Sequence, residues 1–167
     1  MDMGMKTSYI IGIDPDVDKS GVATLLTATK RVVLQSLTFQ ELIRYLQKMR
    51  GESDVIVVVE AGWLNKSNWH LGMFDSKAIA AAKGYSVGEN HRTGKLIADM
   101  AEDIGFITER IKPLNKCWKG KDGKITHEEI AYFIPGFPKQ SNQETRDAAL
   151  IAWNYANYPI KIKTWQR

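Results

Sequence analysis

The hydrophobic pattern of the chain predicts strands that alternate with helices. Short aliphatic runs rich in β-branched residues indicate strands at 9–14, 22–26, 31–37, 55–60 and 106–111. The runs at 9–14 and 55–60 hold almost no polar residue before their last position, which is typical of central strands buried on both faces. The sequence therefore predicts a sheet with these two runs at its centre.

Helices are predicted where apolar residues recur at helical spacing behind a capping sequence. The expected helices run from a capping box at 38–41 to a C-cap at Gly51, from a capping box at 86–89 to Gly105, from 126 to 133, and from a cap at Ser141 or Asn142 to about Asn157. The chain thus starts with a hairpin and continues with alternating helices and strands. This order implies an α/β fold in which helices cover both faces of a mixed sheet.

The 167 residues suit a single domain spanning 1–167. The segment around 61–85 has no clear pattern and is interpreted as a variable insertion, and 161–167 forms a short basic tail. A formal charge of +4 is compatible with a polyanionic partner but does not require one. We expect a cytoplasmic protein with no membrane contact, because Cys117 is the single cysteine and the sequence shows no signal peptide or long apolar run.

Four carboxylates carry the candidate chemistry. Asp14 and Glu60 end the two central strands, and Glu144 and Asp147 are three residues apart near the start of the last helix. Ligands bind at the carboxyl ends of parallel strands in α/β sheets, and residues three apart share a helix face. A hard cation such as Mg²⁺, which Mn²⁺ can replace, takes oxygen ligands of this kind and supports phosphodiester hydrolysis.

Each carboxylate also has an ordinary interpretation. Asp14 could simply form the turn that follows its strand, and Glu60 could be a surface residue at a strand end. Glu144 could complete a capping box with Ser141, and Asp147 could be a solvated residue near a helix N-terminus. The metal site is therefore a hypothesis about the four residues together.

The turn after the first strand partly matches two other kinds of site, a calcium loop and a nucleotide phosphate loop. Its Asp14-x-Asp16-x-Asp18 spacing resembles the start of a calcium loop. Such a loop needs glycine at its sixth place and glutamate at its twelfth, where this chain has Lys19 and Leu25. The phosphate loop of actin-like ATPases also follows a first strand, but those folds need a second similar domain.

Basic and aromatic residues could contact nucleic acid. A loop after the fifth strand carries five lysines, namely Lys112, Lys116, Lys119, Lys121 and Lys124. They could neutralise phosphates, or they could belong to a solvated loop. Trp63 and Trp69 in the variable segment could stack on unpaired bases, or they could be core or dimer-contact residues.

A series of short motifs along nearly the whole chain resembles the RuvC-type Holliday-junction resolvases of the RNase H-like superfamily. The motifs are Ile11-Gly12-Ile13-Asp14-Pro15, Ser20-Gly21-Val22-Ala23, Val57-Val58-Val59-Glu60, Asn90 with Thr93-Gly94-Lys95-Leu96, Lys112-Pro113 with Lys116, Gly120 and Lys124, and Glu144-x-x-Asp147-Ala148-Ala149.

The resemblance implies an RNase H-like, five-stranded mixed sheet with helices on both faces, and a homodimer that acts on branched DNA. It also implies that Asp14, Glu60, Glu144 and Asp147 are the catalytic, metal-binding set. Two features depart from the family: Glu144 stands where the bacterial resolvases usually have Asp, and the 61–85 segment lacks their usual motif. Alternative functions are therefore a non-catalytic nucleic-acid-binding or assembly module, and a nuclease for another substrate such as an RNA–DNA hybrid.

Overall fold

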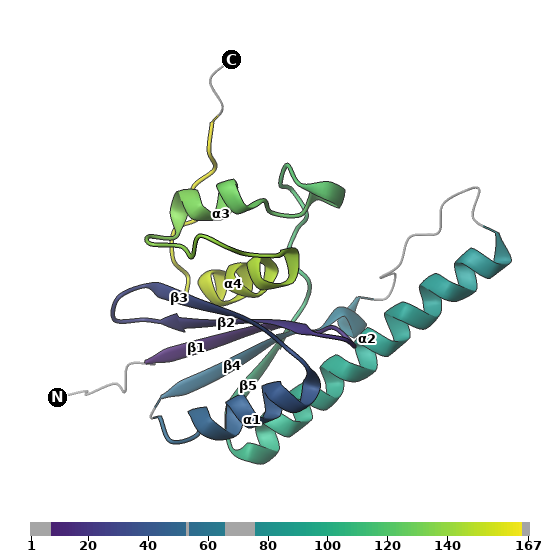
Figure 1. Ribbon diagram of the computed structural model, residues 1–167, viewed down its shortest axis with the longest axis horizontal. Coiled ribbons are helices and arrows are strands. Elements are labelled where there is room, and N and C mark those ends of the chain that lie inside the picture. The colour runs from purple at the N-terminus through teal and green to yellow at the C-terminus, as the bar shows by residue number, and fades with distance from the viewer. Residues whose placement is uncertain (1–7, 53, 66–75, 165–167) are drawn as a thin grey trace.

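The computed structural model describes residues 8–52, 54–65 and 76–164. These residues form a single five-stranded sheet with the order β3-β2-β1-β4-β5 (Figure 1). The strands are β1 (Tyr9–Asp14), β2 (Ser20–Leu26), β3 (Arg31–Leu37), β4 (Val55–Glu60) and β5 (Ile107–Ile111).

The sheet is mixed. Strands β1, β2 and β3 form an antiparallel meander, whereas β4 and β5 run parallel to β1. In the register of the central pair, Ile13 lies beside Val59, so the following residues, Asp14 and Glu60, reach the same edge of the sheet. This edge is the carboxyl end of the parallel strands, as the sequence predicts.

Helices cover both faces of the sheet (Figure 1). Helices α1 (Phe39–Met49) and α2 (Lys77–Ile104) lie on one face, and α3 (His127–Phe133) and α4 (Gln143–Tyr155) lie on the other. The predicted α/β fold class, a five-stranded mixed sheet with helices on both faces, is confirmed.

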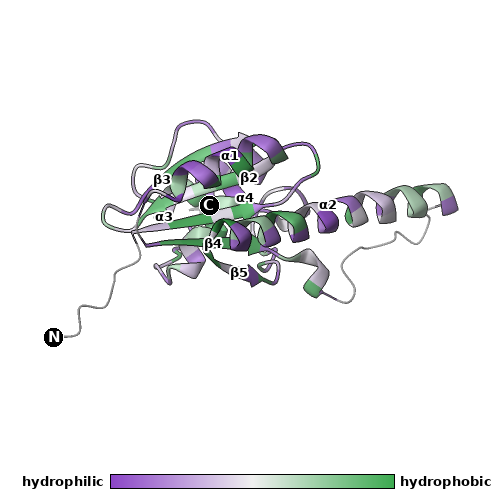
Figure 2. Ribbon diagram, turned by 90° about the horizontal axis from the view of Figure 1, so that it is seen from below, coloured by the Kyte–Doolittle hydropathy of each residue, from purple (hydrophilic) through white to green (hydrophobic). Residues whose placement is uncertain are grey.

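Alternate residues of the central strands build two separate cores. Ile10 and Val58 pack toward α3 and α4, whereas Ile11 and Val57 pack toward α1 and α2. The strands are therefore apolar on both sides, which explains their unbroken aliphatic runs. Figure 2 shows these apolar strands behind the amphipathic helices.

Two glycines allow α4 to lie unusually close to the sheet. A Cβ atom on Gly12 would come within 2.3 Å of the Ala148 carbonyl oxygen, and a Cβ on Gly21 within 2.0 Å of the Glu144 carbonyl oxygen. Ordinary side chains at these positions would push α4 outward. The glycines therefore fix the depth at which α4 presents its acidic residues.

Several predicted helix ends differ in the structure. Helix α2 begins at Lys77 behind the N-cap Ser76, so the predicted start at 86–89 is wrong. The alanine-rich stretch at 77–83 strongly favours helix, so the helix begins behind Ser76 rather than behind Ser86. At α1 the C-cap is Arg50 rather than Gly51, whereas Gly105 caps α2 in the left-handed conformation as predicted (φ 116°).

The two halves of α2 have different surroundings. Ile97, Ala101 and Ile104 in its second half are buried in the core, so this apolar face packs within the subunit. The first half projects beyond the sheet (Figure 1), and there Ile79 and Tyr85 are 48% and 72% exposed. None of the helices in the described ranges is long and apolar enough to cross a membrane.

Candidate active site

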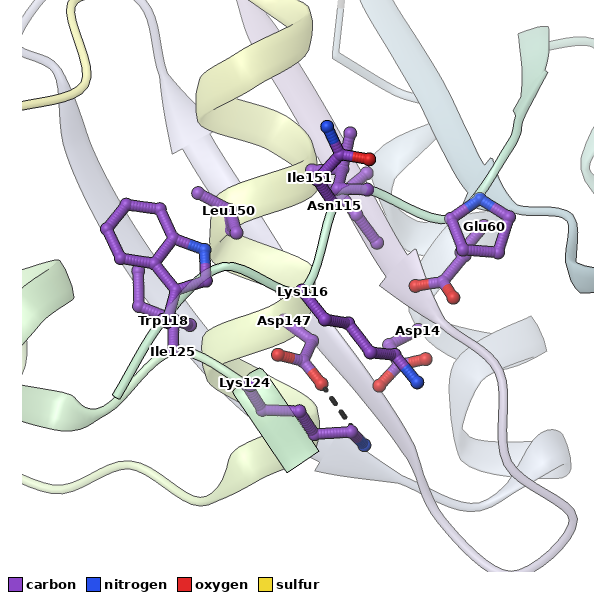
Figure 3. Close-up of a pocket in the computed structure, with 13 residues that line it drawn as sticks. Asp14, Glu60, Asn115, Lys116, Trp118, Lys124, Ile125, Asp147, Leu150 and Ile151 are labelled. Atoms are coloured by element: carbon purple, nitrogen blue, oxygen red, sulfur yellow. Dashed lines mark ion pairs between the residues drawn. The ribbon is translucent and has the colours of Figure 1, made fainter. Parts of the chain in front are cut away.

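Three of the predicted carboxylates line one cavity at the carboxyl edge of the sheet. Asp14 ends β1, Glu60 ends β4, and Asp147 faces them from the second turn of α4 (Figure 3). The cavity has a volume of about 100 Å³. That is room for roughly three water molecules at about 30 Å³ each, or for a partly hydrated cation.

The electrostatics of the cavity disfavour three bare negative charges. Burial raises the pKa of Asp14 well above its ordinary value, and the charges of Glu60 and Asp147 raise it further. Burial and the charge of Asp147 likewise raise the pKa of Glu60. Burial also raises the pKa of Asp147. The fold thus holds acidic groups together at a cost that a bound cation would relieve.

Asp147 is fixed by neighbours on two sides. Gln143, one turn earlier in α4, donates a hydrogen bond from Nε2 to Asp147 Oδ1 at 2.8 Å. Lys124 places its ammonium nitrogen 3.7 Å from Asp147 Oδ2. Gln143 Nε2 also donates to the Ile125 carbonyl oxygen at 3.2 Å, which ties α4 to the lysine-rich loop. The carboxylate therefore has a defined orientation toward the cavity.

Glu144 lies at the margin of this arrangement. It is partly buried but does not line the cavity, and its backbone carbonyl packs against Gly21. Its charge nevertheless raises the pKa of both Asp14 and Asp147. The capping box of α4 is formed by Asn142 and Thr145, so the interpretation of Glu144 as the capping-box residue is wrong.

Two of the five predicted lysines reach the carboxylates. Lys116 and Lys124 line the cavity and point into it (Figure 3). Lys124 lowers the pKa of all three carboxylates, and Lys116 lowers that of Glu60. The other three lysines are exposed on the same loop and do not line the cavity, namely Lys112, Lys119 and Lys121.

The donor chemistry of the cavity fits a hard cation, although the ligand set is not tightly assembled. Among the residues that the structure describes, no three His, Cys, Asp or Glu side chains form a group ready to hold a metal ion. Carboxylate oxygens at the ends of two strands and on one helix are nevertheless the ligands that Mg²⁺ prefers.

A second cavity, of about 480 Å³, adjoins the first and shares Asp14 and Glu60 with it. Trp63 and His91 line it, with their ring centroids 6.3 Å apart in an edge-on arrangement. Burial and the charge of Lys95 lower the pKa of His91. Trp63 also packs against the core beside α2, so both of its predicted roles are compatible with its position. Trp69 lies outside the described residues.

Sequence reasoning missed three residues of this region. Gln143 precedes Asp147 by four residues, and that helical spacing could have revealed the hydrogen bond between them. His91 gave no signal, because only the packing of α2 brings it beside Gly62 and Trp63. Glu129 lies in the first turn of the helix predicted from 126, and no spacing in the sequence indicates that it also contacts the lysine-rich loop.

Comparisons with known proteins give limited information. No protein-family model and no curated protein sequence matches this chain. Among solved structures, the chain is similar to RuvC of T. thermophilus in complex with a Holliday junction substrate, with 13% identity and a TM-score of 0.48. That alignment covers 89% of this chain and 92% of the RuvC chain. An identity this low leaves the chemistry to be decided by the residues of the site.

Proposed function

We propose that the protein is a metal-dependent endonuclease that hydrolyses phosphodiester bonds in branched DNA, in the manner of a RuvC-type crossover-junction nuclease. The observation that carries this proposal is the convergence of Asp14, Glu60 and Asp147 in one cavity with Lys116 and Lys124. Like charges brought together in a partly buried cavity are unfavourable for the fold alone, so their convergence favours a functional reason.

Asp14, Glu60 and Asp147 would hold Mg²⁺, with Mn²⁺ able to replace it, and Glu144 would complete the set from the margin of the cavity. The bound ion would supply Lewis acidity toward the phosphate and toward water. Gln143 keeps Asp147 turned toward this position by its 2.8 Å hydrogen bond. The α4 helix can present Asp147 here because the glycines of β1 and β2 let it approach the sheet.

The lysines would act on the nucleic acid. Lys116 and Lys124 are near enough to the carboxylates to stabilise negative charge on the phosphate under attack. Lys112, Lys119 and Lys121 lie on the exposed part of the same loop and would bind backbone phosphates without reading the base sequence.

The preference for branched DNA and the homodimer rest on the resemblance of the sequence motifs to the resolvases. Trp63 borders the second cavity beside the carboxylates, where it could stack on an unpaired base. The projecting half of α2 exposes Ile79 and Tyr85, which supports an additional contact for a second subunit. A cytoplasmic location remains a prediction from the sequence.

A cleavage assay tests the proposal. Purified protein is incubated with labelled four-way junction, flap, linear duplex and RNA–DNA hybrid, with Mg²⁺, with Mn²⁺ and with chelator. We expect metal-dependent nicking of the junction that Asp14→Asn abolishes and that Asp16→Asn, a change in the adjacent turn, retains. Cleavage of the hybrid alone would keep the chemistry and change the substrate.

The alternative function is a non-catalytic nucleic-acid-binding or assembly module of the same fold. It is motivated by the two departures from the family pattern, which are the sequence of the 61–85 segment and the glutamate at position 144. Salt-sensitive binding of branched DNA with no cleavage of any of the four substrates would support this alternative and contradict the nuclease.

A further inference from the structure

The loop that carries Lys116 and Lys124 is closed on itself. Trp118 donates from its backbone nitrogen to the Gly123 carbonyl at 2.9 Å, and Gly120 donates to the Lys124 carbonyl at 2.9 Å. Gly123 adopts φ of 76°, and a Cβ on Gly120 would come within 2.3 Å of the Lys124 carbonyl oxygen. The loop is therefore a compact turn whose shape sets the position of Lys124.

A buried carboxylate fastens this turn to the protein. Glu129, in the first turn of α3, is only 5% exposed. Its Oε1 accepts hydrogen bonds from the backbone nitrogen of Lys119 at 3.1 Å, from that of Thr126 at 3.1 Å and from the Thr126 hydroxyl at 2.9 Å. Its Oε2 also lies 3.3 Å from the Lys119 nitrogen. One side chain thus joins both ends of the segment 119–126.

The contact with Lys119 exceeds what helix capping needs. Helix α1 starts with the same capping box, in which Glu41 accepts from the Thr38 backbone nitrogen at 3.2 Å. Glu41 is exposed where Glu129 is buried, and Glu41 serves its own helix terminus. Glu129 does the same for α3 and in addition reaches ten residues back to hold the loop.

From these contacts we propose that Glu129 is a positioning residue, whose carboxylate fixes the turn that places Lys124 against the acidic cavity. The path is short: Glu129 binds the Lys119 nitrogen, Gly120 binds the Lys124 carbonyl, and Lys124 extends its ammonium to within 3.7 Å of Asp147. This inference deepens the proposed nuclease function and rests on it for its catalytic consequence.

The test compares Glu129→Ala with the matched variant Glu41→Ala, which removes the same capping group from α1. We expect Glu129→Ala to lower the single-turnover cleavage rate by about tenfold or more, because misplacing a catalytic group by about 1 Å can reduce a rate by about 10²-fold. Glu41→Ala should stay within about twofold of wild type, and Glu129→Gln, whose neutral acceptor holds the Lys119 amide more weakly, should lower the rate by less than Glu129→Ala does.

A double variant shows whether Glu129 acts through Lys124. Once Lys124→Met has removed the ammonium, adding Glu129→Ala should lower the rate by less than about twofold more, since groups that act as one unit are not additive. Losses that multiply in the double variant would overturn the proposal. Cleavage by Glu129→Ala equal to that of Glu41→Ala would overturn it as well.

Amide hydrogen exchange gives a readout that needs no substrate. In Glu129→Ala the Lys119 amide should exchange at least about tenfold faster than in wild type, and in Glu41→Ala it should not change. If Glu129→Ala does not fold, Glu129→Gln decides, because its neutral acceptor should speed exchange at Lys119 more than at Ile130 within α3. Equal exchange at both amides would overturn the proposal. A wild type that cleaves nothing would overturn the nuclease function, whereas exchange would still report whether Glu129 holds the loop.

Discussion

Replacing Asp14 by Asn should make the protein more stable at pH 8 while it abolishes cleavage. Asp14 is a carboxylate whose pKa is raised by burial and by the charges of Glu60 and Asp147, so its ionised form opposes folding. Asparagine keeps the shape of the side chain and removes the charge. Functional sites commonly trade stability for activity in this way.

The size of the effect follows from the register of β1 and β4. Adjacent strands lie about 4.8 Å apart, and Asp14 and Glu60 follow a directly paired position. Two unit charges about 5 Å apart repel by roughly 0.8 kcal/mol at a dielectric constant of about 80 and by roughly 3 kcal/mol at about 20. Lys124 offsets part of this repulsion, so we expect a gain of about 1–2 kcal/mol, or roughly 2–8 °C in Tm.

The pH dependence of the folding stability provides a second check that ionised Asp14 destabilises the fold. A raised folded pKa means that the folded state binds more protons than the unfolded state between the ordinary carboxyl pKa of 3.8 and the folded value. Stability of the wild type should therefore fall as pH rises through this window, and the full penalty should be present above it. In Asp14→Asn this fall should be smaller.

Thermal unfolding followed by circular dichroism from pH 4 to pH 9, in chelator, measures both quantities. The matched variant is Asp16→Ala, because Asp16 Oδ1 accepts from the Asp18 nitrogen at 2.8 Å and so shapes the turn. That variant should lose about 0.5–1.5 kcal/mol. If Asp14→Asn were instead destabilised as much as Asp16→Ala, Asp14 would be a turn-forming residue and our electrostatic reasoning would be refuted.

Three further outcomes are expected. Lys124→Met should lower kcat by roughly 10–100-fold in steady-state cleavage, whereas Lys121→Met, on the exposed part of the loop, should stay within about threefold; equal losses would contradict a local role for Lys124. Gly21→Ala should lower the free energy of unfolding by about 1–3 kcal/mol in denaturant unfolding, because its Cβ would clash with α4. The control Gly88→Ala, whose Cβ would meet no atom within 4 Å, should raise the free energy of unfolding by up to about 1 kcal/mol. The cleavage rate at subsaturating Mg²⁺ should rise with pH through the raised pKa values of the three carboxylates, because protons compete with the cation for them. A cleavage rate that falls with pH over that range would contradict the assigned ligands.

The sequence predicted the sheet well because its strands carry strong local signals. The β-branched runs of β1 and β4 match strands buried on both faces, and the five strands occur where the pattern placed them. The start of α2 was missed because a capping-box spacing at 86–89 is common by chance and says nothing about the helix before it. Local spacing identifies an element more reliably than its first residue.

The candidate site was predictable only in part. Asp14 and Glu60 could be placed together because parallel strands share a carboxyl edge, and Asp147 was a candidate because it shares a helix face with Glu144 near the start of the last helix. Which lysines reach the cavity depends on how the loop closes, and the pairing of Lys119 with Glu129 spans ten residues without a periodic signal. Contacts of this kind arise from tertiary packing and cannot be read from spacing.

The most direct test of the central claim is a titration of the protein with Mn²⁺ or Mg²⁺ by isothermal calorimetry, because it needs no assumption about the substrate. We predict saturable binding by the wild type that strengthens as pH rises, is lost in Asp14→Asn and is retained in Asp16→Asn. Absence of binding by the wild type, or binding that Asp14→Asn leaves unchanged, would contradict the assignment of Asp14, Glu60 and Asp147 as a cation site.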